Sequence, residues 1–388
     1  MAEPQGVLVA DIPLSLYLHF PWCVRKCPYC DFNSHALRGE VPEEQYLDAL
    51  LRDLEYELSV APVNRPLTSI FMGGGTPSLF SGQGIGRLLE SVERLVPFEP
   101  DIEITLEANP GTADGANFRG YRDGGVNRLS IGVQSLNAAH LKALGRIHDP
   151  DEARRAVNLA RAAGFDNINL DLMYALPQQT LAEAEADLEQ VLALSPEHLS
   201  YYHLTLEPNT EFHARPPPLP DAEIAWSMQE HGQQLLADQG FAQYEVSAYA
   251  RDGRQCRHNR NYWEYGDYLG IGAGAHGKLS GPGGITRRAR HKHPRTYQES
   301  AGTAKAVQDD RCIASSELPF EYAMNVLRLN DGQPLQQFER RTGQAATMLA
   351  TPLAEARRRD WLAPDRERLQ ASERGRALLN QLVGLFLP

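Results

Sequence analysis

Six short apolar, β-rich runs alternate with helix-like segments through the first half of the chain. The runs cover residues 15–20, 69–72, 102–107, 128–133, 168–173 and 199–206. The segments between them, such as residues 43–58 and 151–164, carry apolar residues at helical spacing. This alternation is typical of a parallel sheet built from strand–helix units. Because a closed barrel needs eight such units, six units predict an α/β fold with an open, partial (β/α)6 barrel and a cleft.

Polar or glycine-rich stretches directly follow five of the expected strands. They are the cysteine-rich loop after residue 20 and the stretches GGGTPS, EANP, VQS and DLMYALP. The carboxyl ends of parallel strands meet at one rim of the sheet, where barrels of this kind place their chemistry. We therefore expect the functional site at that rim.

The second half of the chain has a different texture. The proline-rich stretch ARPPPLPD, residues 214–221, predicts a stiff, extended linker. We expect a barrel over residues 1–215, an extension of it over residues 216–305, and a small C-terminal, mostly helical, winged-helix-like domain over residues 306–388. The mixed charges of that last part favour a packing or lid role over DNA binding.

Composition excludes several classes of protein. Hydrophobic residues make up 42% of the 388 residues, and no apolar run approaches the ~18 needed to cross a bilayer. The N-terminus does not resemble a signal peptide, so we expect a cytoplasmic protein that meets membranes, if at all, through a partner. The net charge of −12 argues against nucleic acid as a partner. The densest basic stretch, residues 285–295, is expected to be a solvated loop.

Three cysteines, Cys23, Cys27 and Cys30, lie within eight positions, and the other two are Cys256 and Cys312. In a reducing compartment, clustered thiols indicate a metal rather than disulfides. Zinc would need a remote fourth ligand, such as Cys256 or a histidine. A [4Fe–4S] cluster held by three thiolates would instead keep one iron open for another molecule. The residues alone leave both alternatives open.

The spacing of these cysteines, with the aromatic Tyr29 before the last one, resembles the radical S-adenosylmethionine (SAM) superfamily. That resemblance implies a [4Fe–4S] cluster whose open iron is chelated by SAM. The stretch GGGTPS, residues 73–78, matches the superfamily pattern, because glycines let the backbone approach a ligand closely.

Motifs along nearly the whole chain resemble the oxygen-independent coproporphyrinogen III oxidase family of radical SAM proteins. They are LYLHFPWCVRKCPYCDF, GGGTPS, EITLEANPG, RLSIGVQS, LGRIH, DLMYALPQQT and CRHNRNYW. The resemblance implies contacts to SAM from eight residues: Tyr17 near the sulfonium, Gly74, Gly75 and Thr76 at the amino-acid end, Glu107 at polar groups, Arg146 at the carboxylate, and Gln134 and Asp171 at the ribose hydroxyls.

Within this family, the chain resembles the heme chaperones more than the oxidases. Oxidases carry a further cysteine two positions after the third and an N-terminal extension, whereas this chain has Asp31-Phe32 after Cys30 and sixteen residues before Tyr17. The HNxxYW element, which begins at His258, resembles the heme-binding element of the chaperones and implies that His258 binds heme.

Three functions remain as alternatives. The favoured one is a heme chaperone that delivers heme to hemoproteins of the respiratory chain. The second is a radical SAM enzyme that decarboxylates coproporphyrinogen III, so whether the protein is an enzyme stays open. The third, an RNA-modifying radical enzyme, is disfavoured by the acidic composition and by the lack of cysteines for a second cluster.

Overall fold

The computed structural model describes residues 11–388. The first ten residues lie outside the described part of the chain. The expectation that the chain has no signal peptide, and with it the cytoplasmic location, depends on those residues and stays a prediction. Within residues 11–388, no helix combines the length and the apolar character that a bilayer crossing requires.

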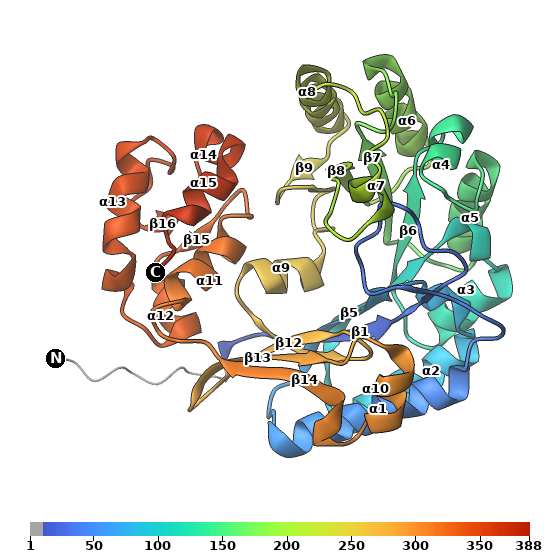
Figure 1. Cartoon of the computed structure of the whole chain (residues 1–388), viewed down its shortest axis with the longest axis horizontal. Coiled ribbons are helices and arrows are strands. Elements are labelled where there is room, and N and C mark those ends of the chain that lie inside the picture. The colour runs from blue at the N-terminus through green and yellow to red at the C-terminus, as the bar shows by residue number, and fades with distance from the viewer. Residues whose placement is uncertain (1–10) are drawn as a thin grey trace.

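Six parallel strands form the wall of an open barrel, as the sequence predicts (Figure 1). Neighbours in the sheet follow chain order, because each strand is connected to the next by a helix that packs on the outside. The strands are β1 (Leu14–Phe20), β4 (Leu67–Gly74), β5 (Phe98–Ala108), β6 (Arg128–Gln134), β7 (Ile168–Tyr174) and β8 (His198–His203).

The helices on the outside of the barrel begin at well-defined caps. Asp149 and Thr180 each accept a hydrogen bond from the backbone three residues later, and the glutamate at that position reaches back to the cap. The apolar faces of the helices pack against the sheet and enclose the main core. These helices are α1 (Glu43–Val60), α2 (Gly82–Leu95), α3 (Gly115–Asp123), α5 (Pro150–Ala162), α6 (Leu181–Ala193) and α8 (Ala222–Asp238). Two shorter helices are α4 (Ala138–Ala143) and α7 (Glu211–Ala214), and Phe212 of α7 packs in a separate small cluster beside the cysteine loop.

The sheet continues beyond the barrel strands at both edges. Strand β11 pairs parallel to β1, and three antiparallel strands follow it. The added strands are β11 (Asp267–Ile271), β12 (His276–Gly281), β13 (Gly284–Arg290) and β14 (Val307–Cys312) on one side, and β10 (Ala248–Ala250) and β9 (Ala242–Gln243) on the other. Helix α10 (Pro294–Ser300) and the short pair β2 (Trp22–Cys23) and β3 (His35–Ala36) lie beside them. The proposed division at residue 305 falls just before β14.

The basic stretch at residues 285–295 is not a solvated loop, so that prediction was wrong. Its first part is β13, and the Arg290 side chain is 1% exposed. Arg290 forms ion pairs with Asp53 at 2.9 Å and Glu57 at 2.5 Å, both on α1. The local sequence cannot reveal this arrangement, because the acidic partners of the arginine lie more than 230 positions earlier in the chain.

A C-terminal helical region packs around a core of its own, as expected (Figure 1, red). Large side chains such as Tyr322, Phe338 and Trp361 fill this core. Arg287 of β13 bonds to Glu321 at 2.5 Å and so ties the region to the sheet. Its elements are α11 (Leu318–Val326), β15 (Gln333–Pro334), α12 (Gln336–Thr342), α13 (Ala350–Arg358), β16 (Arg368–Leu369), α14 (Glu373–Ala377) and α15 (Leu379–Gly384).

Candidate functional site

The three clustered cysteines line one small pocket of about 140 Å³ at the carboxyl rim of the barrel. Each sulfur has a polar group beside it that can donate a hydrogen bond, and such donors stabilise a thiolate or a cluster sulfur. The pairs are Cys23 with the Thr76 hydroxyl at 3.3 Å, Cys27 with the Arg146 guanidinium at 3.6 Å, and Cys30 with the Ser34 hydroxyl at 3.8 Å.

Burial raises the pKa of the Cys23 and Cys30 thiols, although the neighbouring hydroxyls act in the opposite direction. Iron or zinc binds the thiolate form, so metal binding at this pocket must release protons. Cys256 is buried elsewhere, beside Glu103, and does not line this pocket. The three thiols with their donors therefore fit a cluster that has one iron without a cysteine ligand.

The glycine-rich stretch after β4 packs directly against the start of the cysteine loop. The Gly75 and Thr76 amides donate to the carbonyl groups of Phe20 and Trp22 at 2.7 and 2.8 Å. A Cβ atom at Gly75 would meet both carbonyl oxygens at 2.6 Å, and Gly74 adopts a φ of +103°. Larger residues could not make this approach, which holds the β4 turn beside the cysteines.

Two partly buried carboxyl groups face the pocket, Glu107 from β5 and Asp171 from β7. Burial and then the nearby Asp171 raise the pKa of Glu107 to about 8, although the Gly74 amide donates to it at 3.1 Å. Burial also raises the pKa of Asp171, which accepts a hydrogen bond from Asn169 at 2.8 Å. Such groups suit a ligand that brings positive charge or hydroxyl donors.

Arg146 and Gln134 close the other side of the pocket. Arg146 donates to the Gly132 carbonyl at 2.8 Å. Burial lowers the pKa of Arg146, but the nearby Tyr29 and Cys27 outweigh it and raise the pKa overall. Gln134 accepts a hydrogen bond from the Tyr202 hydroxyl at 2.8 Å. The pocket therefore offers a cation beside two carboxyl groups, a set that fits an amino acid with both of its charges.

The structure brings ten of the predicted site residues together at this pocket and separates two. The ten are Cys23, Cys27, Cys30, Gly74, Gly75, Thr76, Glu107, Gln134, Arg146 and Asp171. Tyr17 and His258 instead line a larger cavity next to it. Four residues contribute to both spaces: Phe32, Ser34, Gly74 and Glu107.

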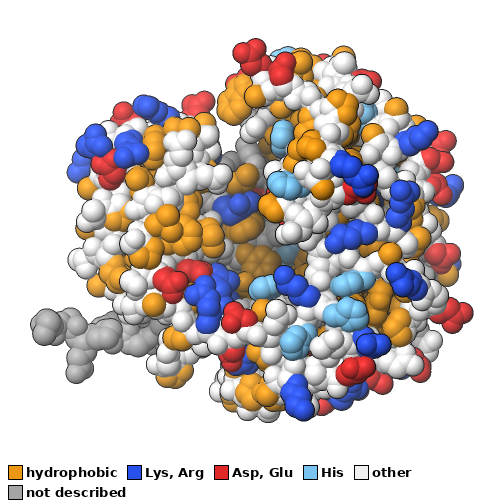
Figure 2. All heavy atoms as spheres, in the orientation of Figure 1, with side chains coloured by type: hydrophobic (Ala, Val, Ile, Leu, Met, Phe, Trp, Pro, Cys, Tyr) orange, Lys and Arg blue, Asp and Glu red, His pale blue; other side chains and the backbone are white. Residues whose placement is uncertain are grey.

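The larger cavity has a volume of about 980 Å³ and lies between the barrel, β11 to β13 and the C-terminal region. Figure 2 shows this hollow between the C-terminal region and the rest of the molecule, with histidine and basic side chains along its edge. Eleven of its 26 lining residues are aromatic residues or histidines: Tyr17, Phe32, Phe71, Tyr262, Trp263, Tyr265 and Tyr268, with His19, His35, His258 and His276.

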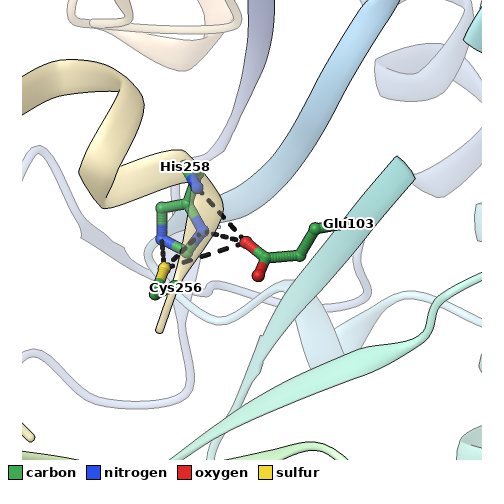
Figure 3. A group of neighbouring side chains, drawn as sticks. All are labelled: Glu103, Cys256 and His258. Atoms are coloured by element: carbon green, nitrogen blue, oxygen red, sulfur yellow. Dashed lines mark hydrogen bonds and ion pairs between the residues drawn. The ribbon is translucent and has the colours of Figure 1, made fainter. Parts of the chain in front are cut away.

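A carboxylate from strand β5 holds the N-terminal end of helix α9 (Arg257–Trp263), which carries the HNxxYW element (Figure 3). Glu103 of β5 accepts hydrogen bonds from the backbone amides of Arg257 at 3.0 Å and His258 at 3.2 Å. It therefore caps the helix, whose own N-terminal residue, Cys256, makes no side-chain cap. Burial by itself would raise the pKa of Glu103. The hydrogen bond from His258 and the positive charge of Arg128 outweigh this effect and lower the pKa to about 2.

The His258 imidazole is held on three sides. Its Nδ1 lies 3.0 Å from Glu103, and its ring stacks on Phe71 with centroids 4.0 Å apart. The Cys256 sulfur lies beside both ring nitrogens, 3.0 Å from Nδ1 and 3.3 Å from Nε2. An ionised carboxylate only accepts, so Nδ1 carries the proton and Nε2 the lone pair. Burial lowers the pKa of His258, which keeps the ring neutral.

Glu103 is a residue of this site that the sequence alone did not single out, although a signal for it was present; Cys256 was considered only as a remote zinc ligand. Glu103 is a charged residue in the middle of the apolar run IEITLE, and a charge there needs a buried partner. Within the glycine-rich stretch of residues 266–277, Gly274 allows a close approach to the cysteine loop beside the cavity. This residue has a φ of +81°, and a Cβ there would meet the Asn33 side chain at 2.4 Å.

Comparison with known proteins gives the family. Residues 17–191 match the radical SAM superfamily, and residues 313–378 match the HemN C-terminal domain. The heme chaperone HemW of Escherichia coli strain K12 is 49% identical, and that of Haemophilus influenzae 48% identical, each over 97% of this chain and 98% of the relative. A mouse protein, radical S-adenosyl methionine domain-containing protein 1, mitochondrial, is 37% identical over 100% of this chain and 90% of its own.

Among solved structures, coproporphyrinogen III oxidase (HemN) of Escherichia coli, a radical SAM enzyme, superposes with a TM-score of 0.82. The superposition covers 100% of this chain and 93% of the oxidase at 24% identity, so it shows a shared fold alone. The full-length relatives settle the branch: the chain belongs to the HemW heme chaperone family of the radical SAM superfamily.

Proposed function

We propose that this protein is a heme chaperone that binds heme in the large cavity and transfers it to hemoproteins of the respiratory chain. We further propose that Cys23, Cys27 and Cys30 hold a [4Fe–4S] cluster and that SAM binds beside it. The observation that carries the proposal is a cavity of about 980 Å³, lined by aromatic rings and histidines, that shares a wall with the cysteine pocket.

The size and lining of the cavity support a large, flat, iron-containing ligand. Its volume lies at the upper end of the roughly 300–1,000 Å³ range of ligand pockets. Aromatic side chains such as those of Tyr262 and the exposed Phe32 line the cavity and can pack against a porphyrin. Neutral imidazole is a good axial ligand for heme iron.

The setting of His258 supports it as a heme ligand. Histidines that bind metals usually donate their other ring N–H to a carboxylate, which fixes the tautomer and the orientation of the ring. Glu103 accepts that bond from Nδ1 of His258 and so leaves the lone pair on Nε2. To bind iron, Nε2 would have to exchange its contact with the Cys256 thiol for the metal.

In the cysteine pocket, we assign Arg146 to the carboxylate of SAM and the Gly74–Thr76 turn with Glu107 to its amino-acid end. Gln134 and Asp171 are assigned to the ribose hydroxyls, and Tyr17 to the side of the pocket that faces the large cavity. When bound, cluster and SAM supply one-electron chemistry. The residues themselves bind, orient and shield these groups from water.

Oxidative decarboxylation of coproporphyrinogen III is the second candidate, because the chain shares its fold with an oxidase of that substrate. The HemW relatives and the Asp31-Phe32 sequence after the third cysteine disfavour it. Anaerobic turnover of cluster-loaded protein with SAM and coproporphyrinogen III separates the two. Formation of the decarboxylated product would establish the enzyme.

The deciding experiment is an anaerobic heme titration of cluster-loaded protein, followed by visible absorption. We expect a saturable Soret shift in the parent and weaker binding in His258→Ala. His231→Ala is the matched control, because His231 lies exposed on α8, paired with Glu185 at 2.8 Å. No saturable binding by the parent would refute the chaperone proposal, and unchanged binding in His258→Ala would refute the role of that residue.

A further inference from the structure

Four histidines line the large cavity, and they differ in whether their ring nitrogens are already used. Both nitrogens of His19 are taken, Nδ1 by the Tyr17 hydroxyl at 2.8 Å and Nε2 by the Asn33 carbonyl at 2.9 Å. Nε2 of His35 lies 3.3 Å from the Asn33 side chain. A ring nitrogen that is already hydrogen-bonded must lose that partner before it can bind iron.

His276 differs from the other three. Among residues 11–388, its imidazole has no hydrogen-bond partner, and the residue is exposed toward the cavity. Its backbone is nevertheless fixed, because it begins β12 and pairs with Ala289 of β13. His276 therefore presents a ring that is free to turn, at a position that the sheet holds in place.

The surroundings of His276 favour a neutral ring. Burial, followed by the positive charges of Lys292 and Arg287, lowers its pKa, and Asp309 offsets this only in part. Iron binds the neutral imidazole. The same two cations also line the cavity, where they can attract the carboxylates of the heme propionates.

The strand order places His276 across the cavity floor from His258. In the sheet, β12 is followed by β11, β1 and β4, and His258 stacks on Phe71 of β4. Three strand spacings separate β12 from β4, which amounts to roughly 14 Å. Between them, β11 contributes Gly270, where a Cβ would meet the His276 carbonyl oxygen at 1.9 Å. The backbones of β11 and β12 therefore pack closely at that point, which fixes the position of His276 in the sheet.

We propose that His276 is an axial ligand of the heme iron, reaching it from the side of the cavity opposite His258. This inference rests on the proposed function, since it assumes that heme enters this cavity. It also assumes a second axial ligand, the role proposed above for His258.

The test is an anaerobic titration of ferric heme into cluster-loaded parent, His276→Ala and His258→Ala proteins, read by absorption and by electron paramagnetic resonance. We expect low-spin heme in the parent and a shift to high spin in His276→Ala, with affinity weakened about tenfold. Added imidazole should restore the low-spin spectrum of His276→Ala, because the missing ring leaves a gap at an exposed position. A merely structural role would not respond to imidazole.

Two controls keep the result interpretable. His276→Met retains a side chain that can bind heme iron through sulfur, so it should give a spectrum of its own rather than the parent's. Iron and sulfide contents equal to the parent's show that each variant has folded. A His276→Ala spectrum identical to that of the heme-bound parent overturns this inference alone, whereas a parent that binds no heme overturns the proposed function as well.

Discussion

The cysteine pocket and the large cavity share a wall but are built in opposite ways. The pocket, about 140 Å³, is lined by thiols, carboxyl groups and a guanidinium, and most of its polar atoms are already arranged. The cavity, about 980 Å³, is lined by aromatic rings and histidines, and its shape depends on α9 and the C-terminal region. The pocket thus suits a small ligand with several charges, and the cavity suits a large one that must enter and leave.

Because the pocket and the cavity share lining residues, binding at one site can affect binding at the other. Phe32, Ser34, Gly74 and Glu107 face both spaces, so a ligand in one can displace a side chain that the other needs. Coupling between two sites requires such differential contacts. Variants that lose one site should therefore show, through ligand binding at the other site, whether the two are coupled.

The largest expected effect is loss of the cluster without loss of the cavity. Cys27→Ser should reduce bound iron and acid-labile sulfide to near zero after anaerobic reconstitution, because the pocket has three cysteines and the cluster needs a thiolate from each. Heme affinity should stay close to the parent's. Cys312→Ser, at an exposed cysteine of β14, should keep its iron. If heme binding disappears together with the cluster, the two spaces form a single site.

Removal of the carboxylate that fixes α9 should affect the cavity alone. Glu103→Ala leaves two backbone amides and the His258 ring without their acceptor, and we expect a loss of about 3 kcal/mol in unfolding free energy. Heme affinity should fall while iron content stays at the parental level. Asp101→Ala is the matched control, since Asp101 contacts the same helix through Arg257 but is exposed. Equal stability losses in urea unfolding would contradict a special role for Glu103.

The protonation of Glu107 gives a smaller effect that depends on pH. Its folded pKa, about 8, is raised, so between about pH 5 and pH 8 the unfolded chain ionises Glu107 while the folded protein keeps it protonated. Stability should therefore fall as pH rises through this window, by at most about 1.4 kcal/mol for each pH unit. Glu107→Gln should flatten this slope in protein without cluster or SAM, measured by urea unfolding. The exposed Glu223→Gln should retain it.

The smallest effect concerns the hydrogen bonds to the cysteine sulfurs. Thr76→Val removes a donor 3.3 Å from the Cys23 sulfur, and a hydrogen bond of this kind stabilises the more negative, reduced cluster. We expect a reduction potential lower by tens of millivolts, since such a bond contributes about 1 kcal/mol. Ser34→Ala, at the longer 3.8 Å contact, should shift it less. A redox titration in which Ser34→Ala has the larger shift would reverse this ranking.

The barrel could be predicted because each of its strands and helices is indicated by a short, continuous stretch of sequence. Each of the six runs, such as residues 128–133 against the observed Arg128–Gln134, reads as a buried strand between helices. The residues at the pocket could be placed together because the ends of parallel strands share a rim. This rule places Cys23 and Glu107 at the same rim, whereas Arg146, which follows α4 and not a strand, was assigned to the pocket only through the resemblance to the family.

The rest depends on contacts between distant parts of the chain. Arg290 reads as a solvated cation until Asp53 and Glu57 on α1 are placed beside it. Likewise, His258 acquires its orientation from Glu103, 155 positions earlier. Periodicity reports which face of an element is buried but not what it meets there, so the sequence predicts a cleft but not which residues line it.

The return of the chain to β1 has a consequence for the order of biosynthesis. Every residue that lines the cysteine pocket lies between positions 23 and 202, whereas the cavity lining reaches from Tyr17 to Asn325. Because β11 joins β1 only after most of the chain has left the ribosome, the residues of the smaller site emerge first. A nascent protein can thus assemble its cluster pocket before it has any enclosed space in which to trap a reactive porphyrin.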